Sequence, residues 1–127
     1  MGRVMPVRVF LVEDTKHLRD VIAELLDSLG NFALVGTATT EAEANLWLLD
    51  HAGSWDLAII DLVLEQGTGM GVIAKCKHSS ATGKVVVFSD YATPGIRRHC
   101  LALGAEAAIP KTDLPAFMGY CSAVASA

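Results

Sequence analysis

The sequence predicts a doubly wound α/β domain, in which helices cover both faces of a five-stranded parallel sheet. Short apolar runs alternate five times with helical segments along the 127 residues. These runs are rich in Val, Ile and Leu without polar alternation, which is typical of strands buried on both faces. Five successive β–α units favour parallel strands joined by right-handed crossovers. We expect a single domain over residues 1–127, with a core of about 7–125 and the strand order 2-1-3-4-5.

The first half of the chain is predicted to hold three strands and two helices. The strands are expected at the apolar runs Val7 to Val12, Phe32 to Val35 and Leu57 to Ile60. Apolar residues spaced three or four apart from Leu18 to Leu29 indicate one face of a helix, and Gly30 suits its end. A capping-box pattern, Thr40 with Glu43, opens a second helix that runs to about His51.

The second half is predicted to add two strands and three helices. The strands are expected at Val85 to Phe88 and Ala107 to Ile109. A helix near Met70 to His78 follows a glycine-rich loop. Pro94 suits the first turn of the next helix, which ends at Gly104. Asp113 opens the last helix, and Gly119 weakens its middle.

Composition excludes several classes of protein. Hydrophobic residues make up 52% and charged residues 19%, so the chain is not disordered. A net charge of -4 argues against a nucleic-acid groove, which needs a basic face. No uncharged apolar stretch reaches the ~20 residues that span a bilayer, and the apolar run after the basic start is too short for a signal peptide.

Cys76, Cys100 and Cys121 form no CxxC pair, and we expect them buried and reduced in a cytoplasmic protein.

Polar residues follow four of the five predicted strands. In a parallel sheet the residues just past the strands share one edge, and open α/β sheets bind ligands there, where the strand order reverses. The residues at this edge are Glu13 and Asp14 after the first strand, Asp61 after the third, Ser89 after the fourth and Lys111 after the fifth. Alone, each of them is an ordinary cap, turn or surface residue; together, in this order, they predict a site.

The charges of these residues indicate what the site binds. Three carboxylates and one lysine leave two negative charges, and two carboxylates about 5 Å apart repel by roughly 3 kcal/mol at a dielectric near 20. A divalent cation neutralises this charge, and oxygen ligands without His or Cys favour Mg²⁺. A metal, a lysine and the hydroxyl of Ser89 around one carboxylate suit phosphoryl transfer onto that carboxylate. Asp61 ends a central strand, so we expect it to be the nucleophile.

The segments VFLVED, DLAIID, VVVFSD and LGAEAAIPK, in this order and spacing, resemble the receiver domain of bacterial response regulators. The resemblance covers about Val7 to the C-terminus. Lys111 lies 22 residues after Ser89, and Gly69 lies eight residues after Asp61, both as in the family. The chain further resembles receivers that occur as whole proteins without an output domain.

The resemblance implies a role for each site residue. Asp61 is expected to be the phosphoacceptor, Asp14 a direct Mg²⁺ ligand, Glu13 a partner of the metal through water, the Val63 carbonyl a further metal ligand, Ser89 the switch hydroxyl and Lys111 the lysine of the family's site.

The resemblance also implies partners. A sensor histidine kinase or a histidine phosphotransfer protein is expected to donate the phosphoryl group, and an unknown downstream protein to respond, with no direct nucleic-acid or membrane binding. The chain is expected to catalyse only its own phosphorylation and self-dephosphorylation. The self-dephosphorylation is expected to be slow, because apolar or bulky residues, Val63 and Tyr91, flank the path of the attacking water in this family. A homodimer through the fourth and fifth helices is a further hypothesis, with Ala116, Phe117 and Tyr120 exposed.

Four positions depart from the family pattern. Glu65 replaces a common proline in the loop after the acceptor. Ala108 stands where an aromatic residue usually rotates inward, so the usual aromatic switch is absent. Asp90 follows Ser89 where a small residue is common, and it would oppose phosphorylation if it faced the site. Thr112 replaces a frequent proline after the site lysine, which predicts no cis peptide bond there.

Three other functions are weighed against this one. A degenerate receiver would bind proteins without phosphorylation, and Asp90 and Ala108 favour it. A phosphatase of the haloacid dehalogenase kind needs a second aspartate where Val63 stands. A flavodoxin-like cofactor binder is disfavoured because the first β–α turn is acidic. Trp47 and Trp55 are expected to serve packing, and the four scattered histidines to be solvated.

Overall fold

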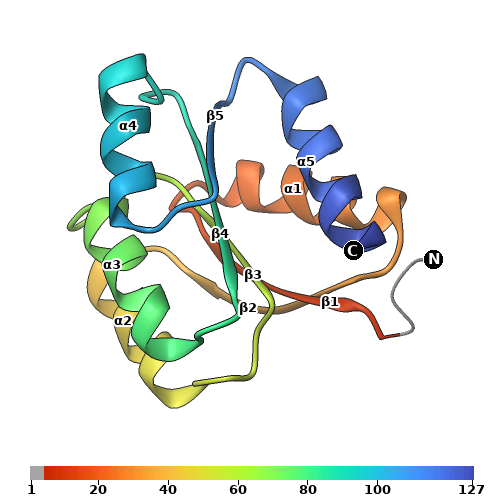
Figure 1. Cartoon of the computed structure of the whole chain (residues 1–127), viewed down its shortest axis with the longest axis horizontal. Coiled ribbons are helices and arrows are strands. Elements are labelled where there is room, and N and C mark those ends of the chain that lie inside the picture. Colours follow the sequence, from red (N-terminus) through yellow and green to blue (C-terminus); the bar gives the residue numbers. More distant parts are fainter. Residues whose placement is uncertain (1–4) are drawn as a thin grey trace.

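The computed structural model describes residues 5–127. The chain folds into a five-stranded parallel sheet with helices on both faces (Figure 1). The elements in chain order are β1 (Val7–Val12), α1 (Lys16–Leu29), β2 (Phe32–Ala38), α2 (Glu41–Asp50), β3 (Leu57–Ile60), α3 (Gly69–Ser79), β4 (Lys84–Ser89), α4 (Pro94–Leu103), β5 (Ala107–Pro110) and α5 (Leu114–Ser126). The strand order is β2-β1-β3-β4-β5. The predicted fold class and strand order are confirmed; residues 1–4, part of the basic start, lie outside the described residues.

Two hydrophobic cores lie on opposite faces of the sheet. Figure 1 shows α2, α3 and α4 on one side of the strands and α1 and α5 on the other. Neighbouring residues of a strand point to opposite faces. Phe10 and Val12 therefore belong to the core beneath α2, α3 and α4, whereas Val9 and Leu11 belong to the core beneath α1 and α5. This double burial explains why the strands read as continuous apolar runs.

The register of the central strands aligns their carboxyl ends. Val12, the last residue of β1, pairs with Ile60, the last residue of β3, and Ile60 pairs with Val87 of β4. At the next pairing, Ser89 of β4 lies opposite Pro110 of β5. The residues that follow these strands consequently reach the same edge of the sheet.

Side-chain caps at two helix starts agree with the sequence. The Thr40 hydroxyl accepts a hydrogen bond from the Glu43 amide at 3.1 Å, and the Glu43 carboxylate accepts one from the Thr39 amide at 3.0 Å. At the start of α5, the Asp113 carboxylate accepts from the Ala116 amide at 3.2 Å. These bonds satisfy amides that have no partner within their own helix.

The second strand is longer than predicted. It continues to Ala38, which pairs with Val12, through Gly36. A Cβ atom on Gly36 would overlap the indole of Trp47, so glycine here lets Trp47 lie directly on the strand. Trp47 stacks on Phe10 with 4.0 Å between ring centroids, and Trp55 is 1% exposed, as expected for packing residues.

Phe117 is buried, contrary to the expectation that it is exposed for dimerisation. It is 0% exposed and stacks on Phe88 with 4.1 Å between ring centroids. Phe117, Cys121 and Val124 are spaced four and three residues apart, so they form the face of α5 that packs on the sheet. Tyr120 is only partly buried and Ala116 is exposed.

The cysteines and histidines lie where the sequence places them. Cys76, Cys100 and Cys121 are free thiols in the buried core. Burial raises the pKa of Cys76 and of Cys121 to about 12, so both thiols are protonated near neutral pH. All four histidines are exposed. The described residues contain no cis peptide bond, as predicted for the bond after Lys111.

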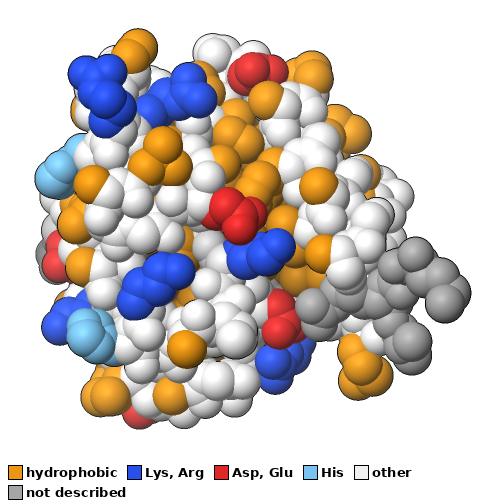
Figure 2. Space-filling model, viewed as in Figure 1, with side chains coloured by type: hydrophobic (Ala, Val, Ile, Leu, Met, Phe, Trp, Pro, Cys, Tyr) orange, Lys and Arg blue, Asp and Glu red, His pale blue; other side chains and the backbone are white. Residues whose placement is uncertain are grey.

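The surface carries charges of both signs. Acidic and basic side chains are interspersed over the face drawn in Figure 2, with hydrophobic side chains between them. None of the helices within residues 5–127 combines the length and the hydrophobicity of a membrane-spanning segment.

Candidate functional site

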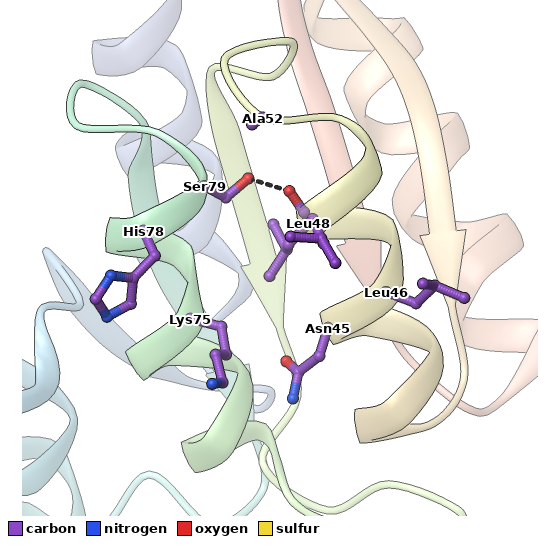
Figure 3. A pocket seen from close by; sticks show the side chains of 8 residues that line it. Asn45, Leu46, Leu48, Ala52, Lys75, His78 and Ser79 are labelled. Carbon is purple, nitrogen blue, oxygen red and sulfur yellow. Dashed lines mark hydrogen bonds between the residues drawn. The ribbon is translucent and has the colours of Figure 1, made fainter.

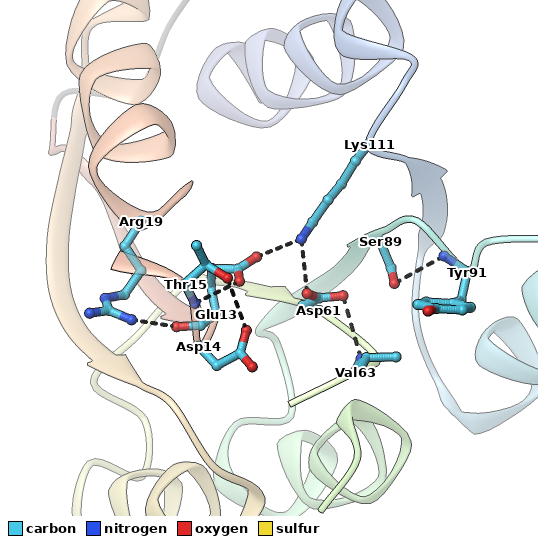
Figure 4. A network of polar contacts seen from close by, with 9 residues as sticks. All are labelled: Glu13, Asp14, Thr15, Arg19, Asp61, Val63, Ser89, Tyr91 and Lys111. Carbon is cyan, nitrogen blue, oxygen red and sulfur yellow. Dashed lines mark hydrogen bonds and ion pairs between the residues drawn. The ribbon is translucent and has the colours of Figure 1, made fainter. Parts of the chain in front are cut away.

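Polar side chains from four different strand ends meet at the carboxyl edge of the sheet (Figure 4). The Lys111 Nζ atom lies 2.8 Å from Glu13 Oε1 and 2.9 Å from Asp61 Oδ2. Carboxylate oxygens of Glu13, Asp14 and Asp61 lie within 4.8 Å of one another. Figure 4 draws Ser89 at the end of β4, where its hydroxyl accepts a hydrogen bond from the Tyr91 amide. The structure therefore brings together the side chains of Glu13, Asp14, Asp61 and Lys111, and it places Ser89 at the same edge of the sheet.

Backbone hydrogen bonds continue past the strands and hold these residues in place. The Glu13 amide donates to the Ala38 carbonyl at 3.0 Å, and the Asp61 amide donates to the Val12 carbonyl at 2.9 Å. The Lys111 amide donates to the Ser89 carbonyl at 3.2 Å. The backbones of Glu13, Asp61 and Lys111 are thus positioned by the sheet itself.

Glu13 is a buried carboxylate, only 1% exposed. Its Oε2 atom accepts a hydrogen bond from the Thr15 amide at 3.0 Å, and its carbonyl accepts one from Arg19 Nη1 at 2.9 Å. Loss of water around Glu13 raises its pKa, against the opposing effect of the Lys111 and Thr15 hydrogen bonds. The supporting roles of Thr15 and Arg19 were not predicted, because nothing in the sequence distinguishes them from other polar residues of a helix start.

Lys111 is the cation of the cluster, and its side chain is 13% exposed. Burial alone would lower its pKa, but the hydrogen bonds to Glu13 and Asp61 outweigh burial and raise the pKa above 10.5. Lys111 is therefore an ammonium ion at neutral pH. One ammonium against three carboxylates leaves a site of negative charge.

The donor set fits a hard divalent cation. Glu13, Asp14 and Asp61 offer oxygen atoms at close range, and neither His nor Cys belongs to this cluster. Asp14 is partly exposed, so a hydrated ion can reach it from solvent. Such oxygen ligands, with room for water, are what Mg²⁺ prefers. The predicted Mg²⁺ site is compatible with this arrangement.

The loop after Asp61 is held close to the site. The Val63 amide lies 3.5 Å from Asp61 Oδ1, and Val63 forms an antiparallel bridge with Thr68. The Gly69 amide donates to the Leu62 carbonyl at 2.9 Å, and a Cβ atom on Gly69 would overlap the Asp61 carbonyl. Glycine eight residues after Asp61 is therefore required for this close approach.

Two of the four departures from the family pattern, Asp90 and Ala108, lie directly after β4 and within β5. Asp90 is exposed. Ala108 is 2% exposed within β5 and offers no ring that could rotate. Ser89 is 0% exposed, and its hydroxyl accepts a hydrogen bond from the Tyr91 amide at 3.3 Å, whereas the Tyr91 side chain is 54% exposed.

A separate cavity of about 570 Å³ lies between α2 and α3 (Figure 3). Apolar side chains of α2 form much of its wall, and Lys75, His78 and Ser79 of α3 line the other side. The Ser79 hydroxyl donates to the Leu48 carbonyl at 2.6 Å, which joins the two helices beside it. None of the five strand-end residues lines this cavity.

The chain belongs to the response regulator receiver domain family, whose sequence model matches residues 9–117. It is 33% identical over 90 residues to protein-glutamate methylesterase/protein-glutamine glutaminase 5 of Myxococcus xanthus, covering 71% of this chain but only 25% of that protein. The chain thus spans about a quarter of that relative's length.

Solved structures share the fold. The response regulator domain of Thermotoga maritima CheB superposes with a TM-score of 0.81 at 19% identity, covering 96% of this chain and 98% of that one. A chain in the CheX–CheY–BeF₃–Mg²⁺ complex from Borrelia burgdorferi superposes with a TM-score of 0.79 at 19% identity, covering 91% and 90%.

Proposed function

We propose that Asp61 accepts a phosphoryl group in a two-component phosphorelay, with Mg²⁺ bound beside it. One observation carries this proposal: the Asp61 carboxylate is bound by Lys111 at 2.9 Å and lies within 4.8 Å of the oxygens of Glu13 and Asp14. A nucleophilic carboxylate between a cation and a metal-binding pair is the arrangement that phosphoryl transfer needs.

Asp14, Asp61 and the Val63 carbonyl would hold the metal directly, and Glu13 through a water molecule. Bound Mg²⁺ would supply positive charge to the phosphoryl oxygens. Lys111 would neutralise another of these oxygens, and the Ser89 hydroxyl would donate a hydrogen bond to one. An oxygen of Asp61 forms the new bond to phosphorus as the bond to the donor's imidazole nitrogen breaks, and the imidazole leaves.

The donor in this proposal is a sensor histidine kinase or a histidine phosphotransfer protein, and the phosphorylated domain then changes its affinity for a downstream protein. We place this exchange in the cytoplasm, where the free thiols would stay reduced. The solved complex with BeF₃ and Mg²⁺ supports this choice of ligands. Apart from its own phosphorylation and dephosphorylation, the domain is proposed to catalyse nothing.

Acetyl phosphate with Mg²⁺ tests this function without the natural donor. We expect the intact mass to increase by one phosphoryl group, and no increase when Mg²⁺ is chelated. Asp61→Asn should abolish the increase because it removes the nucleophilic oxygen. Asp50→Asn, at an exposed carboxylate on the last residue of α2, is the matched control and should react like the unmodified chain.

Two outcomes would contradict the proposal. An equal mass increase in Asp61→Asn would place the phosphoryl group elsewhere. No increase in the unmodified chain would favour a degenerate receiver that binds its partner without phosphorylation.

A further inference from the structure

Glu41, the first residue of α2, reaches across to the loop that follows Asp61. Its carboxylate Oε1 accepts a hydrogen bond from the Thr68 amide at 2.8 Å, 27 residues further along the chain. Its own amide donates to the Gln66 carbonyl at 3.0 Å. One residue of α2 therefore binds two positions of the loop.

Two glycines make room for this side chain. A Cβ atom on Gly67, whose φ is +79°, would overlap the Cβ of Glu41, and a Cβ atom on Gly71 would overlap its Oε2. Gly71 lies in the first turn of α3, so the carboxylate lies against the start of that helix. Any other residue at either glycine would displace Glu41.

α3 lacks a cap of its own. Thr68, the residue before the helix, makes no side-chain capping bond, and the first turn of α3 contains no acidic residue. A carboxylate near a helix N-terminus is stabilised by the free amides and by the helix dipole. Glu41 provides this carboxylate from a different helix.

The contact of Glu41 continues to the phosphoacceptor. Thr68 forms an antiparallel bridge with Val63, and the Val63 amide lies 3.5 Å from Asp61 Oδ1. The next residue, Gly69, donates to the Leu62 carbonyl. The segment from Asp61 to Gly69 thus forms a loop with internal hydrogen bonds, and Glu41 binds this loop at Thr68.

We propose that Glu41 is a positioning residue for the metal site: by holding Thr68, it fixes Val63, and with it the Val63 carbonyl, beside Asp61. This inference rests on the proposed function, because it assigns the Val63 carbonyl to the metal. Glu41 is not among the residues proposed to hold the metal or the phosphoryl group. Its effect is to lower the freedom of the loop before Mg²⁺ binds.

Mg²⁺ titration by calorimetry of the full chain tests this role. Glu41→Ala should weaken Mg²⁺ binding by about tenfold, the usual effect of losing a group that orients a metal ligand. Glu41→Gln keeps an oxygen that can accept from the Thr68 amide, so it should recover most of the affinity. Glu43→Ala is the matched control: it removes a carboxylate from the same turn of α2, but one that binds the Thr39 amide and not the loop.

Amide hydrogen exchange without metal separates positioning from general stability. We expect faster exchange at residues 66–69 in Glu41→Ala, and unchanged exchange there in Glu43→Ala.

Faster exchange with unchanged Mg²⁺ affinity would overturn the positioning role, as would equal affinity losses in Glu41→Ala and Glu43→Ala. No Mg²⁺ binding by the unmodified chain would overturn the proposed function and this inference together, whereas normal binding by both the unmodified chain and Glu41→Ala would overturn the inference alone.

Discussion

Glu13 and Asp61 share a single ammonium ion, and this sharing governs the charge of the site. Both carboxylates are almost fully buried, at 1% and 6% exposure, and Lys111 contacts both of them. Without Lys111, two buried negative charges would face each other in a medium that screens them poorly. The lysine therefore stabilises the fold in the absence of a bound metal.

Lys111→Met should lower the free energy of unfolding at neutral pH by about 2 kcal/mol, somewhat less than the loss of a fully buried ion pair. The folded-state pKa of Lys111 is raised, so its contribution is complete below the ordinary value of 10.5 and is lost as pH rises through the higher folded value. Urea unfolding should therefore show a difference between the two proteins that shrinks above pH 10.5.

Lys16→Met is the control for this measurement. Lys16 pairs with Asp20 at 2.8 Å, but its side chain is 80% exposed, so its loss should leave the unfolding free energy nearly unchanged. A Lys111 effect as small as this, or one that does not vary with pH, would contradict the shared-ammonium account.

Val63 and Tyr91 lie at the rim of the site, with side chains 50% and 54% exposed. Neither the Val63 side chain nor the Tyr91 ring favours the approach of water, so we predict slow loss of the phosphoryl group. Val63→Asn should speed the decay roughly tenfold, because one hydrogen bond to the attacking water lowers the barrier by about 1.4 kcal/mol.

Phosphate release after removal of excess acetyl phosphate measures this decay. Val21→Asn, at an exposed valine of α1, makes the same change away from the site and should leave the rate unchanged. An unchanged rate in Val63→Asn would show that this side chain does not limit access of water.

The strand-end residues could be predicted from sequence because each follows an apolar run by one or two positions. The parallel strand order then brings Glu13, Asp61 and Lys111 together, independently of the conformation of the loops. Glu41 could not be predicted in the same way. Its pattern reads as an ordinary acidic residue at a helix start, and its contact depends on the path of a loop 27 residues away.

At the scale of the elements, a glycine in β2 and a glycine in α5 differ in what surrounds them. Gly36 in β2 lies under the Trp47 indole, whereas a Cβ atom on Gly119 in α5 would point into open space. The sequence predicts that Gly119 weakens the middle of its helix, whereas it places Gly36 just after the end of the second strand. Only the packing of α2 on β2 shows that Gly36 is required.

The two glycines should therefore respond to alanine with opposite signs. Gly119→Ala should raise the free energy of unfolding by about 0.8 kcal/mol, because alanine favours the helical backbone. Gly36→Ala should lower it by about 2 kcal/mol, because the added methyl displaces Trp47 from Phe10. Urea unfolding of both variants measures the two effects, and a stabilised Gly36→Ala would show that the indole adjusts without cost.

Element boundaries were predicted well where caps or glycines mark them and less well in β2. The Thr40–Glu43 box and Asp113 locate the starts of α2 and α5 by chemistry that acts within four residues. The end of β2 depends instead on its pairing with β1, which continues to Ala38. Pairing between distant segments leaves no local signal in the sequence.

At the scale of the whole molecule, a homodimer through α4 and α5 stays a hypothesis, with less support now that Phe117 is buried. Leu101 and Leu114 are the exposed leucines of these two helices, at 48% and 42%. If the dimer forms, sedimentation should show a larger species with beryllofluoride and Mg²⁺, and Leu101→Glu should reduce it. A monomer both with and without beryllofluoride and Mg²⁺ would remove the hypothesis.

The proposed site, built from separate strand ends, would bind Mg²⁺ and a phosphoryl group at Asp61. Backbone amide NMR spectra with Mg²⁺ and beryllofluoride, a mimic of the phosphoryl group, test it most directly. We predict the largest shifts at residues 13–14, 61–63, 89–91 and 111, in the unmodified chain but not in Asp61→Asn. Spectra that do not change, or that change equally in Asp61→Asn, would contradict the account.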